Sequence, residues 1–251
     1  MLRGYYTAAN GIINEQRILN VITNNMANVK TAGYKNETAI HTTFADELLL
    51  INGKKSQTGT IRYRTLDNTY TNLEQASFEV TGSRMDAALI GNVYFNIRQR
   101  TTGDVLLTRN GQFSLDAEGC LAVGSAGRIL DENGEDIPLG TADFTISRDG
   151  VITTDDGRTY RLGLTYLPPD TEIERIDTNM FRPYDGFETG NIPDGEAYEV
   201  RQGSYERSNV DVAEETLKAM DSQNVFTACS TALKIMNSIN QIAANDLAKI
   251  Q

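Results

Sequence analysis

Apolar residues at both ends of the chain recur in steps of three and four, and this spacing constrains the fold more than any other feature. Such steps place side chains on one face of an α-helix. A helix over residues 2–29 would be about 42 Å long, and Gly33 just beyond it takes the left-handed conformation of a helix end without steric cost. Gln16 breaks the first stripe once. The apolar residues of this stripe are Leu2, Tyr5, Ala9, Ile12, Leu19, Ile22 (or Thr23), Met26 and Val29.

A second stripe of the same kind occupies the C-terminal segment. Asp211 can accept hydrogen bonds from the first turn of a helix, and Glu214 stands at the third helical position, as in a capping box. A helix over residues 212–250 would be about 58 Å long. The stripe comprises Val225, Cys229, Ala232, Met236, Ile239, Ala243 and Ile250, widened by Leu217, Leu233 and Leu247.

Between the two stripes the hydrophobic period changes to two, which is typical of β-strands. Asn110-Gly111 separates two short apolar runs and predicts a type I′ hairpin, and Asp149-Gly150 repeats the device. The alternation of residues 160–166 predicts a strand with one buried face. Residues 76–205 are therefore predicted to form an antiparallel all-β domain, large enough to bury a core of its own.

The predicted fold class is α+β, because the one plausible partner for the N-terminal stripe within the chain lies at the opposite terminus. Residues 1–35 and 206–251 are expected to pair as a discontinuous helical coiled-coil domain, into which the antiparallel all-β domain is inserted. Residues 36–75 are expected to form a connector, partly extended. Within it, residues 43–53 continue either as a short helix or as an extended piece.

A pair of helices cannot bury all of this apolar surface, so a second apolar face is expected to remain exposed and to favour contacts with further copies. If each copy contacts the next heterologously and the rotation does not close, the product is a tube or filament. The residues expected outside the narrowest seam are Ile13, Val21, Ile22, Ile235 and Ile242.

The predicted assembly interface combines stripe positions with asparagines. Asparagine side chains both donate and accept hydrogen bonds, so Asn24, Asn25 and Asn28 are expected to set the register between neighbouring helices. The alternative for these asparagines is fraying at a helix end. The candidate interface residues are Leu2, Tyr5, Ile12, Leu19, Ile22, Asn24, Asn25, Met26, Asn28, Val29, Leu217, Val225, Cys229, Met236, Ile239 and Ile250.

Charge and hydropathy argue against several classes of partner. A net charge of -11 disfavours binding to a nucleic-acid backbone, which needs clustered Lys and Arg. The longest apolar run, Leu48–Ile51, is far too short to insert into a membrane. Polar residues interrupt the apolar positions near the N-terminus, so no cleavable signal peptide is expected.

Candidate catalytic and metal-binding residues are few. His41, the single histidine, has no nucleophile motif around it. Cys120 and Cys229 show neither metal-ligand nor disulfide spacing. The acidic residues 131–136 lack the order of a calcium loop and predict a hairpin turn. We therefore expect no catalytic residue, no metal and no cofactor.

Several segments together resemble the bacterial flagellar rod and hook protein family. NNMANVKTAGYK (residues 24–35) is similar to the N-terminal signature of that family, with Met26 where Leu is more usual, and QGSYERSNVDVAEE (residues 202–215) is similar to the segment that opens its C-terminal helix. Residues 81–97, 106–121 and 146–152 resemble parts of its β domain. The resemblance covers essentially the whole chain. Residues 223–229 depart from it, since they keep an aromatic residue but lack the charges usual there.

The resemblance implies a structural subunit of the flagellar basal-body rod, of the proximal- or distal-rod type. Such a subunit would leave the cell through the flagellar type III export apparatus, without a cleavable signal peptide. It would assemble with copies of itself and with other rod and hook subunits into a helical hollow shaft that transmits torque. The alternatives are a secreted β-rich binding module on a helical oligomerisation stalk and an enzyme carried on the β domain.

Overall fold

The structure, a computed structural model, describes residues 2–43, 64–168, 171–184, 192–193 and 197–248; for residues 2–3, 41–43, 64–68 and 243–248 it describes the backbone only. The chain forms two compact units. We call the first the helical unit; it comprises Met1–Ala27, Glu37–Thr71 and Asp211–Gln251. We call the second the β unit; it comprises Asn28–Asn36 and Asn72–Val210.

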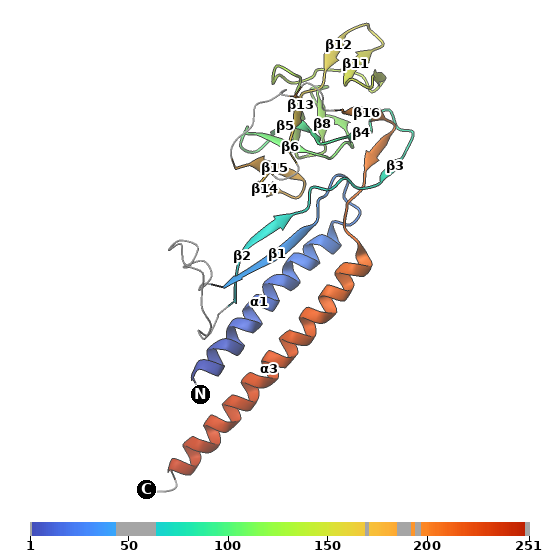
Figure 1. Cartoon of the computed structure of the whole chain (residues 1–251). Coiled ribbons are helices and arrows are strands. Elements are labelled where there is room, and N and C mark those ends of the chain that lie inside the picture. Colours follow the sequence, from blue (N-terminus) through green and yellow to red (C-terminus); the bar gives the residue numbers. More distant parts are fainter. Residues whose placement is uncertain (1, 44–63, 169–170, 185–191, 194–196, 249–251) are drawn as a thin grey trace. The chain divides into compact units, whose positions relative to one another are not determined.

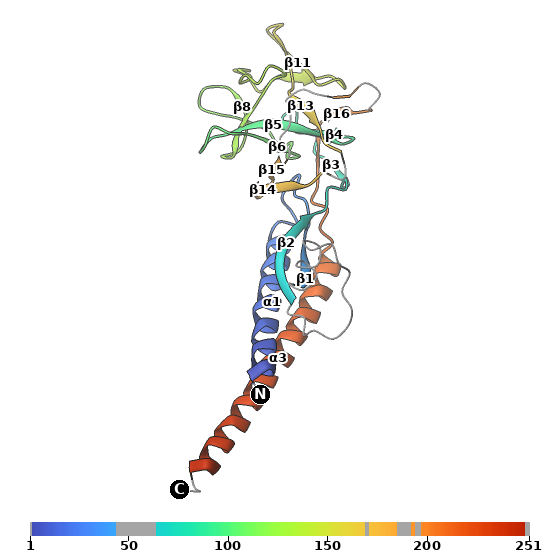
Figure 2. The ribbon, with the colours of Figure 1, turned by 60° about the vertical axis from the view of Figure 1, so that its left-hand side comes forward.

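Two long helices lie antiparallel in the helical unit (Figures 1 and 2). Helix α1 spans Leu2–Ala27 and helix α3 spans Val212–Ala248. The start of α3 is capped as predicted, because the Asp211 carboxylate accepts hydrogen bonds from the backbone N–H groups of Ala213 (2.8 Å) and Glu214 (3.3 Å). Helix α1 ends slightly before the predicted limit, and Thr31 N donates to the Asn28 carbonyl (3.1 Å) to form a turn.

A two-stranded hairpin lies alongside α1 (Figure 1). Its strands, β1 (Glu37–Thr43) and β2 (Arg64–Thr71), pair antiparallel with one irregularity between Ile40 and His41. The predicted connector, residues 36–75, therefore contains regular paired strands and is divided between the two units. Residues 44–53, where a helix or an extended piece was expected, lie outside the described residues, as does the side chain of His41.

The β unit is built from short strands joined by tight turns, in agreement with the period-two pattern. Its strands are β3 (Phe78–Val80), β4 (Ala87–Ile90), β5 (Val93–Gln99), β6 (Val105–Thr108), β7 (Ser114–Leu115), β8 (Leu121–Val123), β9 (Gly127–Ile129), β10 (Phe144–Ile146), β11 (Val151–Thr154), β12 (Thr159–Arg161), β13 (Leu164–Tyr166), β14 (Ile173–Asp177), β15 (Met180–Pro183), β16 (Glu199–Gln202) and β17 (Ser204–Glu206).

All of the described strand pairs are antiparallel. The largest sheet has the strand order β14-β15-β6-β5-β9-β8-β7, and β13 pairs with β5 beside this path. A second sheet has the order β10-β11-β12, and two further pairs, β16-β4 and β17-β3, complete the unit. Together with the two terminal helices, this arrangement confirms an α+β chain with a central antiparallel β domain.

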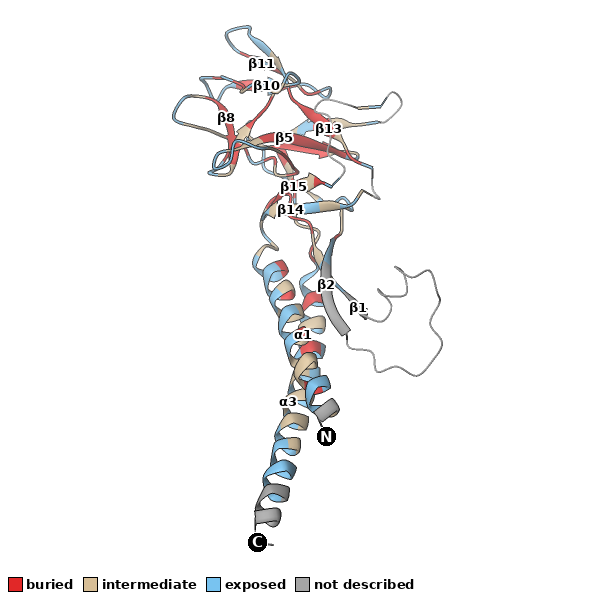
Figure 3. Cartoon of the chain, turned by 90° about the vertical axis from the view of Figure 1, so that its left-hand side faces the viewer, coloured by how far each residue is buried: buried red, intermediate tan, exposed pale blue. Residues whose placement is uncertain are grey.

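Among the described residues the β unit has a large hydrophobic core and a smaller cluster of Tyr94, Leu107, Leu167 and Phe181. In the large core, Phe95, Ile97 and Leu106 on neighbouring strands of the large sheet are fully buried, and Phe144 and Ile152 join them from the second sheet. At about 25 cal/mol per Å² of apolar surface, burial of these side chains is the main favourable term in the stability of this unit. Figure 3 shows the buried residues concentrated along β5, β8 and β13.

The predicted hairpin at Asn110-Gly111 is wrong. Strand β6 before it pairs with β5 and β15, whereas β7 after it pairs with β8. Gly111 is required for another reason: a Cβ there would lie 1.6 Å from the Ala87 carbonyl oxygen. The backbone of Ala87 crosses at this point and donates to the Gly111 carbonyl (2.9 Å). Glycine is therefore needed at this position because the backbone of Ala87 passes close to it. Residues next to Gly111 in the sequence do not indicate this contact.

The hairpin predicted at Asp149-Gly150 is confirmed, since β10 and β11 pair antiparallel around it. Gly150 has a positive φ of 79°, whereas no described non-glycine residue has one, so the turn is not of type I′. The run 160–166 is split into β12 and β13, and Thr165 is buried as well as Leu162 and Leu164, so the prediction of one strand with a single buried face is wrong. At 131–136 the chain turns back, with Leu130 bridged to Asp136.

Candidate functional site

The two helices of the helical unit approach each other through small residues. A Cβ added at Gly11 would lie 2.9 Å from the Cys229 sulfur, and one at Gly4 would lie 3.1 Å from the terminal methyl of Met236. Gly4 and Gly11 are one heptad apart on α1, and Met236 and Cys229 are one heptad apart on α3. Cys229 and Met236 of the stripe predicted on α3 are thus in contact with α1. On α1 the residues at these contacts are the two glycines and not the larger residues of the predicted stripe.

Enlarging Gly11 is expected to destabilise the helical unit. Gly11→Leu should cost at least about 2 kcal/mol, because overpacking forces the helices apart. Gly4→Ala is the matched control: its neighbour is the flexible end of Met236, and alanine favours the helix by about 1 kcal/mol over glycine. Thermal melts followed by circular dichroism at 222 nm would measure both. Equal melting temperatures for Gly11→Leu and wild type would contradict the close approach.

Asn25 is the polar centre of the helical unit and is fully buried. Its amide nitrogen donates to the Glu37 carbonyl (2.7 Å) and to the Glu215 carboxylate (3.1 Å), and its amide oxygen accepts from Glu37 N (3.1 Å). One side chain of α1 thus holds the start of β1 and the first turns of α3. Glu215 is itself buried and also accepts from Lys218 Nζ (2.9 Å). This arrangement supports a register role for Asn25 within one chain.

Much of the apolar surface of the helical unit has no cover within the described residues. Helices α1 and α3 carry intermediate or exposed residues along most of their length (Figure 3). Leu217 is 64 % exposed and Ile242 61 %. The large apolar side chains exposed on the two helices are Tyr5, Tyr6, Ile13, Met26, Val212, Leu217, Met220, Val225, Ile235, Ile239 and Ile242. Exposed apolar surfaces of this kind are typical of sites of protein–protein association.

The predicted interface residues fall into three groups. Ile22 and Asn25 are buried, Ile12, Leu19, Cys229 and Met236 are half-buried in the helical unit, and Asn28 and Val29 are half-buried in the β unit. Tyr5, Asn24, Met26, Leu217, Val225 and Ile239 are exposed. The side chain of Leu2 and the whole of Ile250 lie outside the described residues. The described residues of the list thus comprise two that are buried, six that are half-buried and six that are exposed.

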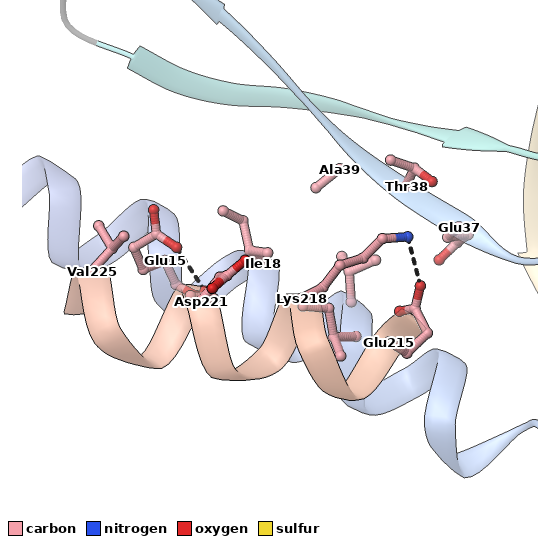
Figure 4. Close-up of a pocket in the computed structure, with 12 residues that line it drawn as sticks. Glu15, Ile18, Glu37, Thr38, Ala39, Glu215, Lys218, Asp221 and Val225 are labelled. Atoms are coloured by element: carbon pink, nitrogen blue, oxygen red, sulfur yellow. Dashed lines mark hydrogen bonds and ion pairs between the residues drawn. The ribbon is translucent and has the colours of Figure 1, made fainter. Parts of the chain in front are cut away.

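A pocket of about 340 Å³ opens between α1, α3 and β1 within the helical unit (Figure 4). Its apolar lining comes from Ile18, Val21, Ile22, Ala39 and Val225. Its charged lining consists of Glu15, Glu37, Asp221 and Lys218 at the rim and of Glu215, which is buried and accepts hydrogen bonds from Asn25 and Lys218. Ser222 on α3 donates to the Glu15 carboxylate (2.6 Å) and so ties the two helices together at this rim. The pocket is an apolar depression with an acidic edge.

The β unit contains a buried charge cluster that the sequence analysis missed. The Glu206 carboxylate accepts from Lys35 Nζ (2.7 Å), Arg109 Nη1 (3.1 Å) and the backbone N–H of Ala76 (2.9 Å). All three charged side chains are buried. Burial lowers the pKa of Lys35, and the attraction of Glu206 opposes this shift. Lys35 also donates to the Glu74 carbonyl (2.7 Å).

The backbone around this cluster is joined by further hydrogen bonds. Gly33 N donates to the Glu206 carbonyl (2.8 Å) and Asn36 N to the Asn209 side chain (2.6 Å). Gly33 has a φ of 67°, and a Cβ there would lie 2.4 Å from the carbonyl carbon of Arg109. The guanidinium carbon of Arg175 lies 4.5 Å from the centre of the Tyr34 ring, in a cation–π contact. The chain entering the β unit is therefore fixed to the chain leaving it.

One sequence signal could have indicated the cluster. Lys35, Arg109 and Glu206 lie in three of the segments that carry the family resemblance, and they are charged residues of opposite sign. Their segments are separated by long stretches of sequence, so their meeting depends on tertiary structure. Tyr34, next to Lys35, is completely buried as well.

Among the described residues, one group of potential metal ligands comes together: Asp116, Glu118 and Cys120. The Asp116 carboxylate already accepts from Cys120 N (2.9 Å), Glu118 N (3.0 Å) and Arg128 (2.6 Å). The hydrogen bond from Cys120 N is the main reason why the pKa of Asp116 lies below its usual range. Burial raises the pKa of the Cys120 thiol. These contacts account for the group as a closed turn, and we assign no metal to it.

No helix in the described part of the chain is long and apolar enough to cross a lipid bilayer.

Comparison with known proteins places the chain in the class of flagellar hook and basal-body proteins. Residues 6–35 match the family described as flagella basal body rod protein, and residues 88–154 match the flagellar hook protein FlgE/F/G D1 domain. Residues 201–247 match the C-terminal family of flagellar basal body rod FlgEFG proteins. The three matches thus fall on α1 with the turn that follows it, on the core of the β unit, and on β17 with α3.

Whole-chain relatives define the family more narrowly. The flagellar basal-body rod protein FlgG of Bacillus subtilis (strain 168) is 30% identical over 270 residues, which cover 98% of this chain and 99% of the relative. FlgF of Caulobacter vibrioides is 24% identical, with 94% of each chain covered. FlhO of Bacillus subtilis, a flagellar hook-basal body complex protein, is 26% identical over the full length of both chains. The chain belongs to the flagellar basal-body rod protein family, whose members are structural proteins of the flagellar rod.

Proposed function

We propose that this chain is a subunit that polymerises through its terminal helices into the helical, hollow shaft of the flagellar rod and so transmits torque. The observation that carries the proposal is the uncovered apolar surface on α1 and α3. Burial of one isoleucine or leucine side chain contributes about 1.5–3 kcal/mol. The exposed residues of the two helices therefore provide a large driving force for contacts with neighbouring copies.

Coiled-coil pairing of α1 with α3 is part of this proposal. The heptad spacing of Gly4 and Gly11 opposite Met236 and Cys229 supports it, as does the position of Asn25 against Glu215 at the other end of the seam. A buried asparagine at one seam position fixes register at a cost in stability. The helical domain would consist of residues 1–35 and 206–251, with residues 76–205 as the inserted β domain.

The partners in this proposal are copies of the same chain and other rod and hook subunits. The family names of the relatives support this set of partners. The chain would reach the basal body through the flagellar type III export apparatus, and it would act as a passive structural element without catalytic turnover.

Ile239→Asp tests the proposal directly. The substitution places a charge on the exposed apolar face of α3 and should raise the critical concentration for assembly at least about tenfold, which corresponds to about 1.4 kcal/mol per contact. Asn240→Asp is the matched control, because it adds the same charge at the next, exposed polar position. Sedimentation of the purified full chain over a concentration series, with electron microscopy of the pellet, gives the measurement. Unchanged assembly by Ile239→Asp would contradict the proposal.

A further inference from the structure

We infer that the pocket between α1, α3 and β1 receives the distal part of α3 from a second copy of this chain. The inference rests on the proposed assembly and names one contact within it. The inserting surface, which we call the α3 stripe, consists of Ile235, Ile239 and Ile242. The receiving surface is the apolar lining of the pocket with its acidic rim.

The α3 stripe has the properties of an inserting helix face. Its residues are 55 %, 49 % and 61 % exposed. Their spacing of four and three residues places them on one side of the helix. An amphipathic helix that docks into an apolar groove uses anchors at this spacing. The stripe is therefore a continuous ridge of branched apolar side chains.

The stripe extends past the described part of α1. Helix α1 begins at Leu2, and Gly4 in its first turn already lies against Met236. Helix α3 continues to Ala248, so Ile239 and Ile242 lie beyond the level at which Met236 meets Gly4.

The pocket matches the stripe in chemistry and in charge. Ile18, Ile22 and Val225 line it with aliphatic carbon, and its volume of about 340 Å³ suits a few aliphatic side chains. Its rim carries three acids, Glu15, Glu37 and Asp221, whereas Lys218 is paired with the buried Glu215. Lys234, next to the stripe, is the one charged residue of α3 between Asp221 and Asp246. The single positive charge beside the stripe would thus meet an acidic rim, which favours the correct orientation of approach.

The geometry excludes insertion of the stripe into the pocket of its own chain. Contacts of Cys229 with Gly11 and of Met236 with Gly4 hold the distal half of α3 against the first half of α1. The pocket lies further along, at Ile18 and Ile22. Each copy therefore carries the α3 stripe and the pocket at different positions along its helical unit. If a copy receives the stripe of one neighbour and inserts its own stripe into another, the contact is heterologous and propagates from copy to copy.

A charge exchange in the full chain tests the inference. Lys234→Glu would place a negative charge against the acidic rim of the neighbouring copy. Asp221→Lys would place a positive charge at the rim against Lys234 of the neighbouring copy. Each single variant should raise the critical concentration for assembly about tenfold or more. An equimolar mixture of the two variants should assemble like wild type, because each variant then meets a complementary partner. Asn237→Glu, at an exposed polar position of α3, is the control and should change assembly less than Lys234→Glu.

Cross-linking gives a second readout. In chains with Cys120→Ala and Cys229→Ser, Ile239→Cys in one batch and Ala39→Cys in another should form a disulfide-linked dimer on mixing and oxidation. Asn237→Cys should give less than a tenth of that yield. A dimer formed between the two batches would support the pocket as the receiving site.

The outcomes separate the inference from the proposed function. If both single charge variants assemble like wild type and the cross-link does not form, the inference is overturned. Polymerisation through the helices is then still intact. Assembly lost with Ile18→Asp but unaffected by Lys234→Glu assigns the pocket to another segment and also overturns it. A wild-type chain that stays monomeric at all concentrations overturns both.

Discussion

Glu206→Ala is expected to lower the free energy of unfolding of the β unit by about 3–5 kcal/mol. The substitution removes the single carboxylate that faces both Lys35 and Arg109 and leaves two buried cations without an ion-pair partner. The Ala76 N–H also loses its acceptor. A buried charge without compensation is among the few single changes with an effect of this size.

Urea denaturation measured by tyrosine fluorescence would test this expectation, since the chain has 11 tyrosines and no tryptophan. Glu79→Ala is the matched control: its ion pair with Arg207 is longer (3.7 Å) and exposed, so it should cost no more than about 1 kcal/mol. Adding Lys35→Met to Glu206→Ala should recover part of the loss, because one of the two buried cations is removed. Equal effects of the two alanine substitutions would refute the role assigned to the cluster.

Asn25→Ala is expected to destabilise the helical unit by about 2–4 kcal/mol. The change removes hydrogen bonds to both backbone groups of Glu37 and to the buried Glu215 carboxylate. Because these partners lie on β1 and α3, both contacts of α1 should weaken together. The stripe residues on α1 do not replace them, since they are apolar.

Hydrogen exchange in the full chain provides a local measurement. Asn25→Ala should increase exchange at the Glu37 amide and through the second turn of α3, with the β core unchanged. Asn20→Ala, an exposed position of the same helix, should alter stability by no more than about 0.5 kcal/mol, in the stabilising direction, because alanine is the better helix former. If the two variants exchange alike, the buried contacts of Asn25 do not determine the register.

The sequence predicted the type and position of the secondary-structure elements better than the contacts between them. The helix cap at Asp211 and the hairpin at Asp149-Gly150 follow from neighbouring residues, and both are present. Asn110-Gly111 carried the same local signal, yet a crossing of Ala87 uses its glycine. Local turn chemistry cannot distinguish these cases, because glycine serves both a tight turn and a close backbone approach.

The candidate site shows the same division. On α3 the stripe positions Cys229 and Met236 meet α1 as the spacing suggested. On α1, Tyr5 and Met26 were predicted in the seam but are exposed. Helical periodicity identifies an apolar face, but it does not give the distance at which a partner helix packs against that face. Two glycines brought the helices close on a neighbouring face, and the larger side chains of α1 were left for other contacts.

By itself the sequence determined that the ends are helical, that the middle is an antiparallel β structure, and that the chain resembles flagellar rod and hook proteins. These properties depend on spacing, capping and short motifs, all of which are local. Only the tertiary structure decided which face of α1 meets α3, how β1 and β2 complete the helical unit, and that Lys35, Arg109 and Glu206 form one buried cluster. Those features depend on contacts between residues far apart in the chain, whose geometry is set by the packing of the whole unit.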